Sequence, residues 1–120
     1  MAPPVTIYGI KNCDTMKKAR AWLDGHDLAY AFHDYKREGV AKSKLEQWVK
    51  RLGWETVLNR AGTTFRRLPD ADKENLTEKK VIALMLAEPS MIKRPILEAG
   101  GGIAAGFQAG AYEKLLKRWI

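Results

Sequence analysis

Residues 7–19 read IYGIKNCDTMKKA and hold Cys13, the only cysteine of the chain. Val5–Gly9 is rich in β-forming residues and predicts a buried strand. Between Asp14 and about Gly25 the apolar residues recur at helical spacing, which predicts a helix. Cys13 is therefore expected where a strand gives way to the N-terminus of a helix.

A second strand predicted over Leu28–Asp34 completes a strand–helix–strand unit. The helix between the strands places Met16, Ala19 and Leu23 on one face. Strands joined in this way run parallel and are connected by a right-handed crossover. The first third of the chain thus predicts a parallel pair of strands with a helix packed on them.

The rest of the chain predicts a helical segment, a hairpin and a last helix. A capping box at Ser43 begins a helix that ends near Leu52, and Thr77 is expected to cap a helix that runs to Leu86. The other predicted elements are a helical turn or two within 54–59, a loop with a short helix over 65–75, strands over 95–97 and 103–107 around a glycine turn, and a helix over 112–119. This order is the one expected of an α/β thioredoxin-like fold.

Composition indicates one globular domain over residues 1–120, with a helical insertion at about 42–90. One cysteine excludes an internal disulfide framework, and no apolar run is long enough for a membrane span or a signal peptide. We expect a reduced, cytoplasmic protein. The net charge of +7 favours an anionic partner, although most of this charge is expected to be solvated surface.

The position of Cys13 predicts a reactive thiol rather than an inert buried one. Backbone N–H groups and the helix dipole stabilise a thiolate at a helix N-terminus. Met16 occupies the place of the second cysteine in a C-x-x-C motif, so this chain cannot run an intramolecular dithiol cycle. The sulfur would need an external thiol, most simply glutathione or a glutaredoxin-like protein.

Five segments together resemble the ArsC/Spx family, and most of all its YffB-like branch of small bacterial thiol reductases. These segments are residues 8–15, Lys36–Gly39, Leu52–Trp54, Asn59–Thr64 and Ile92–Leu97. The combination of a Cys-x-Thr loop with a late Arg-Pro-hydrophobic segment is specific to that family. The resemblance covers nearly the whole chain.

The resemblance implies roles for individual residues. Cys13 matches the nucleophilic cysteine, Arg94 matches an arginine that holds the anionic substrate, and Pro95 matches a proline that is usually cis in thioredoxin-like folds. Either Asn59 or Arg60 fills a second anion-binding place. The remaining assignments are Asn12 to anion binding and Thr15 to shaping of the site.

A third arginine of arsenate reductases has no counterpart, because the matching neighbourhood reads AAGF at 104–107. This puts arsenate reduction in doubt, since charge-assisted bonds to arginine contribute much of the affinity for an oxyanion. The favoured function is a glutathione-dependent thiol/disulfide reductase with no bound cofactor. The alternatives are an arsenate reductase that uses glutathione and glutaredoxin, and an Spx-like non-enzymatic regulator that binds RNA polymerase.

Other partner classes are expected to be absent. His26 and His33 lack metal-ligand spacing and are predicted to be structural or surface residues, so no metal is expected. The glycines at 100–106 do not match a dinucleotide fingerprint. We expect a monomer with no membrane partner.

Overall fold

The computed structural model describes residues 5–120, which fall into two compact units. We call them the sheet unit, made of the chain up to Asp34 together with Arg94–Ile120, and the helical unit, Tyr35–Lys93. Cys13 and Arg94 both belong to the sheet unit. Their geometry can therefore be described within one unit.

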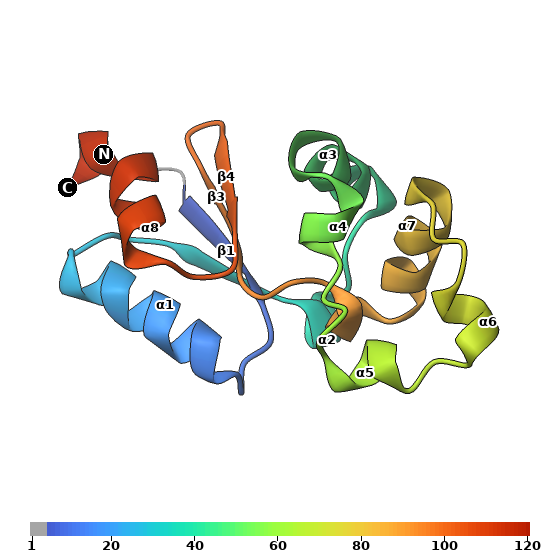
Figure 1. Ribbon diagram of the computed structural model, residues 1–120. Coiled ribbons are helices and arrows are strands. Elements are labelled where there is room, and N and C mark those ends of the chain that lie inside the picture. Colours follow the sequence, from blue (N-terminus) through green and yellow to red (C-terminus); the bar gives the residue numbers. More distant parts are fainter. Residues whose placement is uncertain (1–4) are drawn as a thin grey trace. The chain divides into compact units, whose positions relative to one another are not determined.

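The sheet unit is built on a four-stranded mixed sheet (Figure 1). Its strands are β1 (Val5–Gly9), β2 (Ala31–Asp34), β3 (Ile96–Ala99) and β4 (Gly102–Ala105), in the spatial order β2-β1-β3-β4. β1 pairs with β2 in parallel and with β3 in antiparallel orientation, and β3 forms an antiparallel hairpin with β4. The predicted parallel pair and the predicted hairpin are both confirmed, and the fold is thioredoxin-like.

The hairpin turn depends on glycine. Gly100 and Gly101 join β3 to β4 with φ values of +53° and +86°, in the left-handed region that side chains disfavour. The run of glycines therefore determines where the last two strands turn back on each other.

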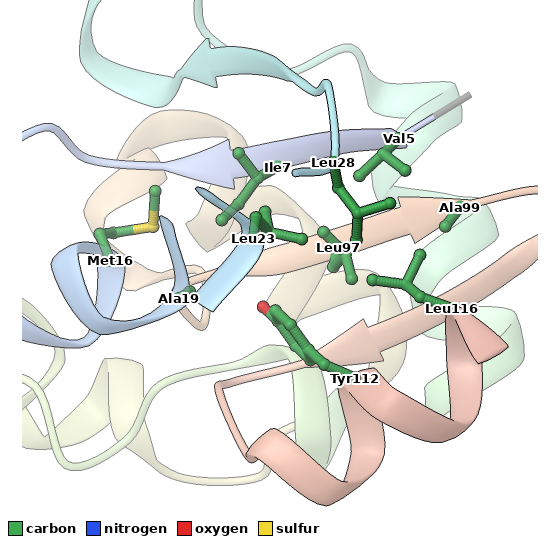
Figure 2. Packing of buried hydrophobic residues seen from close by; sticks show 10 residues of the cluster. All are labelled: Val5, Ile7, Met16, Ala19, Leu23, Leu28, Leu97, Ala99, Tyr112 and Leu116. Atoms are coloured by element: carbon green, nitrogen blue, oxygen red, sulfur yellow. The ribbon is translucent and has the colours of Figure 1, made fainter. Parts of the chain in front are cut away.

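One face of the sheet packs against two helices, α1 (Asp14–Gly25) and α8 (Ala109–Leu115). Alternate residues of β1 and β3 point to this face, because successive strand side chains point to opposite sides. The buried cluster, shown in Figure 2, consists of Val5, Ile7, Met16, Ala19, Leu23, Leu28, Leu97, Ala99, Tyr112 and Leu116. The predicted apolar face of the first helix is thus confirmed as the buried one.

This cluster gives the first testable prediction. Leu97 is 0% exposed, so Leu97→Ala is expected to lower the free energy of unfolding by about 2–5 kcal/mol through lost burial and a residual cavity. Urea denaturation measures the loss. Ile120→Ala is the control, because Ile120 is 46% exposed and should change the free energy by less than about 0.5 kcal/mol. Equal losses in both variants would contradict the assigned core.

The helical unit separates β2 from β3 along the chain. It contains α2 (Tyr35–Glu38), α3 (Lys42–Leu52), α4 (Trp54–Val57), α5 (Thr63–Arg66), α6 (Asp70–Lys73), α7 (Glu78–Ala87) and the 3-10 helix η1 (Pro89–Met91). Trp48 of α3 and Met85 of α7 are fully buried in this unit. The predicted cap of α7 is confirmed, since the Thr77 hydroxyl accepts the N–H of Lys80 at 3.2 Å.

The capping box predicted at Ser43 is wrong. Helix α3 begins at Lys42, and Ala41, with extended backbone angles, is its N-cap. Ser43 therefore lies inside the first turn, where its hydroxyl makes no capping bond to the helix. The helix begins without a side-chain cap, and the burial of Leu45, Trp48 and Val49 accounts for its position.

Several element boundaries differ from those predicted. The strand predicted over 95–97 lies at Ile96–Ala99, and the last helix, predicted over 112–119, begins at Ala109. Two further differences have local backbone reasons. β2 begins at Ala31 because the Leu28 N–H still bonds to the carbonyl of Leu23 at 3.1 Å, as part of the exit from α1. β4 ends at Ala105 because Gly106 turns away with φ of +75°. The predicted insertion at about 42–90 lies within the helical unit, and the prediction of a single domain stays a prediction.

Candidate active site

Cys13 is the N-cap of α1 and the last residue of the loop that begins at Ile10. Its backbone is extended, with φ of −136° and ψ of +130°, and its carbonyl accepts the first helical hydrogen bond, from the Lys17 N–H at 3.0 Å. The side chain is half-buried and packs against the cluster of Figure 2. The strand-to-helix placement expected for this thiol is what the fold provides.

Burial raises the pKa of the Cys13 thiol, but four favourable contributions outweigh it. The backbone N–H groups of Met16 and Thr15 lower this pKa, and Arg94 lowers it further through a side-chain hydrogen bond and through its positive charge. The net pKa lies below the ordinary thiol value. Both N–H groups belong to the first turn of α1, where the Cys13 side chain makes no regular capping bond.

Arg94 is brought to Cys13 from a distant part of the sequence. The Arg94 guanidinium contacts the sulfur from just before β3, although residues 14–93 of the chain separate the two. The peptide bond between Arg94 and Pro95 is cis, as the resemblance implied. The carbonyl of Pro95 accepts the N–H of Gly106 at 2.7 Å, which ties this segment to the loop after β4.

The other residues predicted near Cys13 along the chain are Asn12 and Thr15. Asn12 is exposed on the loop before the cysteine. Thr15 is half-buried, and its contribution to the thiolate comes from the backbone N–H. The anion-binding role of Asn12 and the site-shaping role of Thr15 stay predictions.

Arg60 and Asn59 belong to the helical unit, and the structure does not place them relative to Cys13. The Arg60 guanidinium lies 5.4 Å from the centroid of the Trp54 ring, a cation–π contact. The backbone N–H of Asn59 donates to the carbonyl of Met91 at 2.8 Å. Which of these two residues binds an anion stays a prediction.

The neighbourhood matched to the third arginine of arsenate reductases is aromatic. Phe107 follows Gly106 and packs edge-on against Tyr112, with ring centroids 4.9 Å apart at 87°. Phe107 and Cys13 both pack against the same buried cluster. Among the described residues of the sheet unit, Arg94 is the cation that lowers the pKa of Cys13.

Sequence reasoning predicted that backbone N–H groups would favour the thiolate, but it did not assign them to Thr15 and Met16, which lie in the first turn of α1. It missed the close contact between Gly9 and the Met16 side chain. A glycine at the end of a buried strand, without a turn to explain it, was the available signal.

The described residues offer no obvious metal centre. Among residues 5–120 no group of three or more His, Cys, Asp or Glu side chains is arranged to hold a metal ion. His26 instead stacks on Trp22 at 3.9 Å, and His33 lies 5.0 Å from the Tyr8 ring. In the same range every helix is too short or too polar to cross a membrane.

Each unit has a surface hollow that Cys13 does not line. One, of about 370 Å³, lies between α3 and α7 and is floored by Ile82, Ala83 and Leu86. The other, of about 410 Å³, lies beside α8 and is lined by Glu113, Lys114 and neighbouring residues.

A single thiol at a helix N-terminus, beside an arginine and on a thioredoxin-like sheet, defines a candidate monothiol site of the thioredoxin-like class. The chain belongs to the ArsC family, whose model matches residues 8–115. It is 37% identical over 109 residues to an uncharacterised protein of Haemophilus influenzae, covering 91% of this chain and 96% of that one. It is 27% identical to the global transcriptional regulator Spx of Streptococcus mutans, covering 95% of this chain and 84% of the regulator.

Solved structures agree with this assignment. A protein named YFFB superposes with a TM-score of 0.91 at 59% identity, covering 93% of this chain and 98% of that one. An arsenate reductase (ArsC) related protein from Brucella melitensis has a TM-score of 0.75 at 54% identity, covering 95% of both chains. The resemblance to the YffB-like branch is thereby confirmed.

Proposed function

We propose that this protein is a glutathione-dependent thiol/disulfide reductase that uses Cys13 as its single nucleophile. The observation that carries the proposal is the environment of the sulfur. Two backbone N–H groups and the Arg94 guanidinium favour the thiolate, which is the form that attacks disulfides. Membership of a family that includes an arsenate reductase related protein supports a redox role for this cysteine.

The proposed cycle needs one sulfur from the protein and one from outside. The Cys13 thiolate attacks the glutathione sulfur of a mixed disulfide between glutathione and a substrate. The old S–S bond breaks, and the substrate leaves as a thiolate that takes up a proton. Cys13 is then joined to glutathione. The thiolate of a second glutathione attacks that bond, which releases oxidised glutathione and restores the Cys13 thiolate. Over one cycle, one free glutathione thiol is consumed, the substrate is released as a thiol, and the two glutathiones leave together as oxidised glutathione.

Arg94 has two roles in this cycle. Its positive charge favours the Cys13 thiolate before attack. The same guanidinium would pair with a carboxylate of glutathione, which is an anion at neutral pH. Phe107, in the neighbourhood matched to the third arginine of arsenate reductases, cannot donate to an oxyanion. A glutathione-containing disulfide therefore suits this site better than arsenate does.

The ionisation of Cys13 tests the proposal, because alkylation of a one-cysteine chain reports on that thiol alone. The pH midpoint of iodoacetamide alkylation should be lower for the folded protein than for the same protein unfolded in urea. Incubation with oxidised glutathione should add one glutathione to the folded chain, detectable by mass spectrometry. Either an unshifted midpoint or the absence of the adduct would reject the proposed function.

The same pKa shift has a defined effect on stability. Because the folded pKa of Cys13 is depressed, the thiolate stabilises the folded protein most at pH values above the pKa of the unfolded thiol. This contribution declines as the pH falls and is lost below the folded pKa.

A second candidate function is a regulator of transcription. The observation in its favour is the match to proteins named global transcriptional regulator Spx over 95% of the chain. Under this reading the exposed cations contact RNA polymerase, and the thiol is regulatory or dispensable. This candidate would be favoured if the native protein shows no reductase activity and its Cys13→Ser variant still captures RNA polymerase.

A further inference from the structure

We propose that Met16 is a positioning residue for Cys13: its side chain, fitted against Gly9, holds the first turn of α1 so that the N–H groups of Thr15 and Met16 face the sulfur. This inference rests on the proposed function only in treating the Cys13 thiolate as the active form. It gives a structural role to Met16, which occupies the position of the second cysteine in a C-x-x-C motif. It also explains the glycine at the end of β1.

The contact between Gly9 and Met16 leaves no room for a side chain on β1. A Cβ built on Gly9 would lie 2.9 Å from the Met16 Cε and nearer still to its Sδ. Gly9 does not have a positive φ, so backbone conformation does not require glycine there. The requirement is one of space, and Met16 is what fills that space.

Met16 has little freedom to move out of this position. Its side chain is 1% exposed and belongs to the cluster that includes Ile7, Ala19 and Leu23. Figure 2 shows its thioether directed from α1 toward β1. Close-packed interiors resist the displacement of a side chain, so the contact with Gly9 constrains the backbone that carries Met16.

That backbone is the part that stabilises the thiolate. The N–H of Met16 lowers the pKa of Cys13, as does the N–H of the preceding Thr15. Gly9 lies four residues before Cys13 and Met16 three residues after it, so their contact closes a short segment with the sulfur in its middle. Small displacements of the first turn change the distance between the N–H dipoles and the sulfur, on which their effect depends.

A double-mutant cycle tests the proposal, with the Cys13 pKa from pH-dependent alkylation as its readout. Met16→Ala and Gly9→Ala should each raise the thiol pKa, the first by releasing the turn and the second by displacing Met16. Alkylation at a pH below the native midpoint should accordingly slow several-fold. In the double variant the added methyl enters vacated space, so its pKa should lie closer to native than the sum of the single shifts.

Two further variants separate positioning from general stability. Met16→Leu keeps an apolar side chain against Gly9 and should retain the native thiol pKa. Leu116→Ala empties part of the same cluster from α8, so it should lower the thermal midpoint without changing the pKa. If Gly9→Ala does not fold, the contrast between Met16→Leu and Met16→Ala decides.

Unchanged thiol pKa values in the single variants, or shifts that simply add in the double variant, would overturn the inference. The measurement uses neither glutathione nor a disulfide substrate. If the Cys13 pKa shifts of the two single variants are not additive in the double variant, but no glutathione adduct forms, the positioning role is supported and the proposed reductase is rejected. If a glutathione adduct forms but the pKa shifts are absent or simply add, the reductase is supported and the positioning role is rejected.

Discussion

Cys13→Ser is expected to lower the rate of glutathione mixed-disulfide reduction by roughly a thousandfold or more, because the chain has no second sulfur to take over the attack. A serine hydroxyl at the same N-cap position remains protonated at neutral pH and is a poor nucleophile toward sulfur. Steady-state turnover of a glutathionylated peptide, with glutathione reductase consuming the oxidised product, measures the effect.

The fold should survive this substitution. Cys13 is half-buried rather than central to the core, and serine is a favourable N-cap residue. We expect a thermal midpoint close to that of the native chain. A Cys13→Ser protein that is folded and retains native turnover would refute the assignment of Cys13 as the nucleophile.

Arg94→Gln should give the second largest effect, a loss of about ten- to a hundredfold in kcat/KM for the same substrate. The substitution removes a hydrogen bond and a positive charge that both lower the pKa of Cys13, so the thiol pKa should rise. At neutral pH a smaller fraction of the protein then carries the thiolate. The pH profile of kcat/KM should move to higher pH along with the alkylation midpoint.

Two control variants make this prediction specific. Arg94→Lys retains the charge but not the planar donor set, so its loss should be smaller than that of Arg94→Gln. Arg118→Gln removes one positive charge from the same unit, where Arg118 stacks on Trp119 at 4.5 Å. If Arg118→Gln reduced kcat/KM as much as Arg94→Gln, the effect would reflect overall charge rather than contact with the sulfur.

Much of the sheet unit could be predicted because its signals are local. The β-forming run Val5–Gly9 and the spacing of Met16, Ala19 and Leu23 indicate a strand and a helix without any knowledge of the partners. The cysteine between them could be placed at a helix N-terminus on the same grounds. These predictions depend on neighbours in sequence, which is why they were correct.

The parts that could not be predicted depend on distant contacts or on weak local choices. A capping box at Ser43 is a good local pattern, but burial of Trp48 and its neighbours placed the N-cap two residues earlier, at Ala41. The pairing of Gly9 with Met16 arises only when β1 and α1 are packed together. Arg94 could be brought to Cys13 from the sequence only through a family resemblance, because no local pattern links them.

The thioether of Met16 has a consequence for how the oxidised protein can be recognised. Proteins with two active-site sulfurs can close an internal disulfide, and their oxidised and reduced forms differ by two hydrogen atoms. In the proposed cycle the oxidised form of this chain is instead a mixed disulfide between Cys13 and an external thiol, since Cys13 is its only thiol. Its intact mass in a cell extract would therefore identify the molecule with which it last reacted.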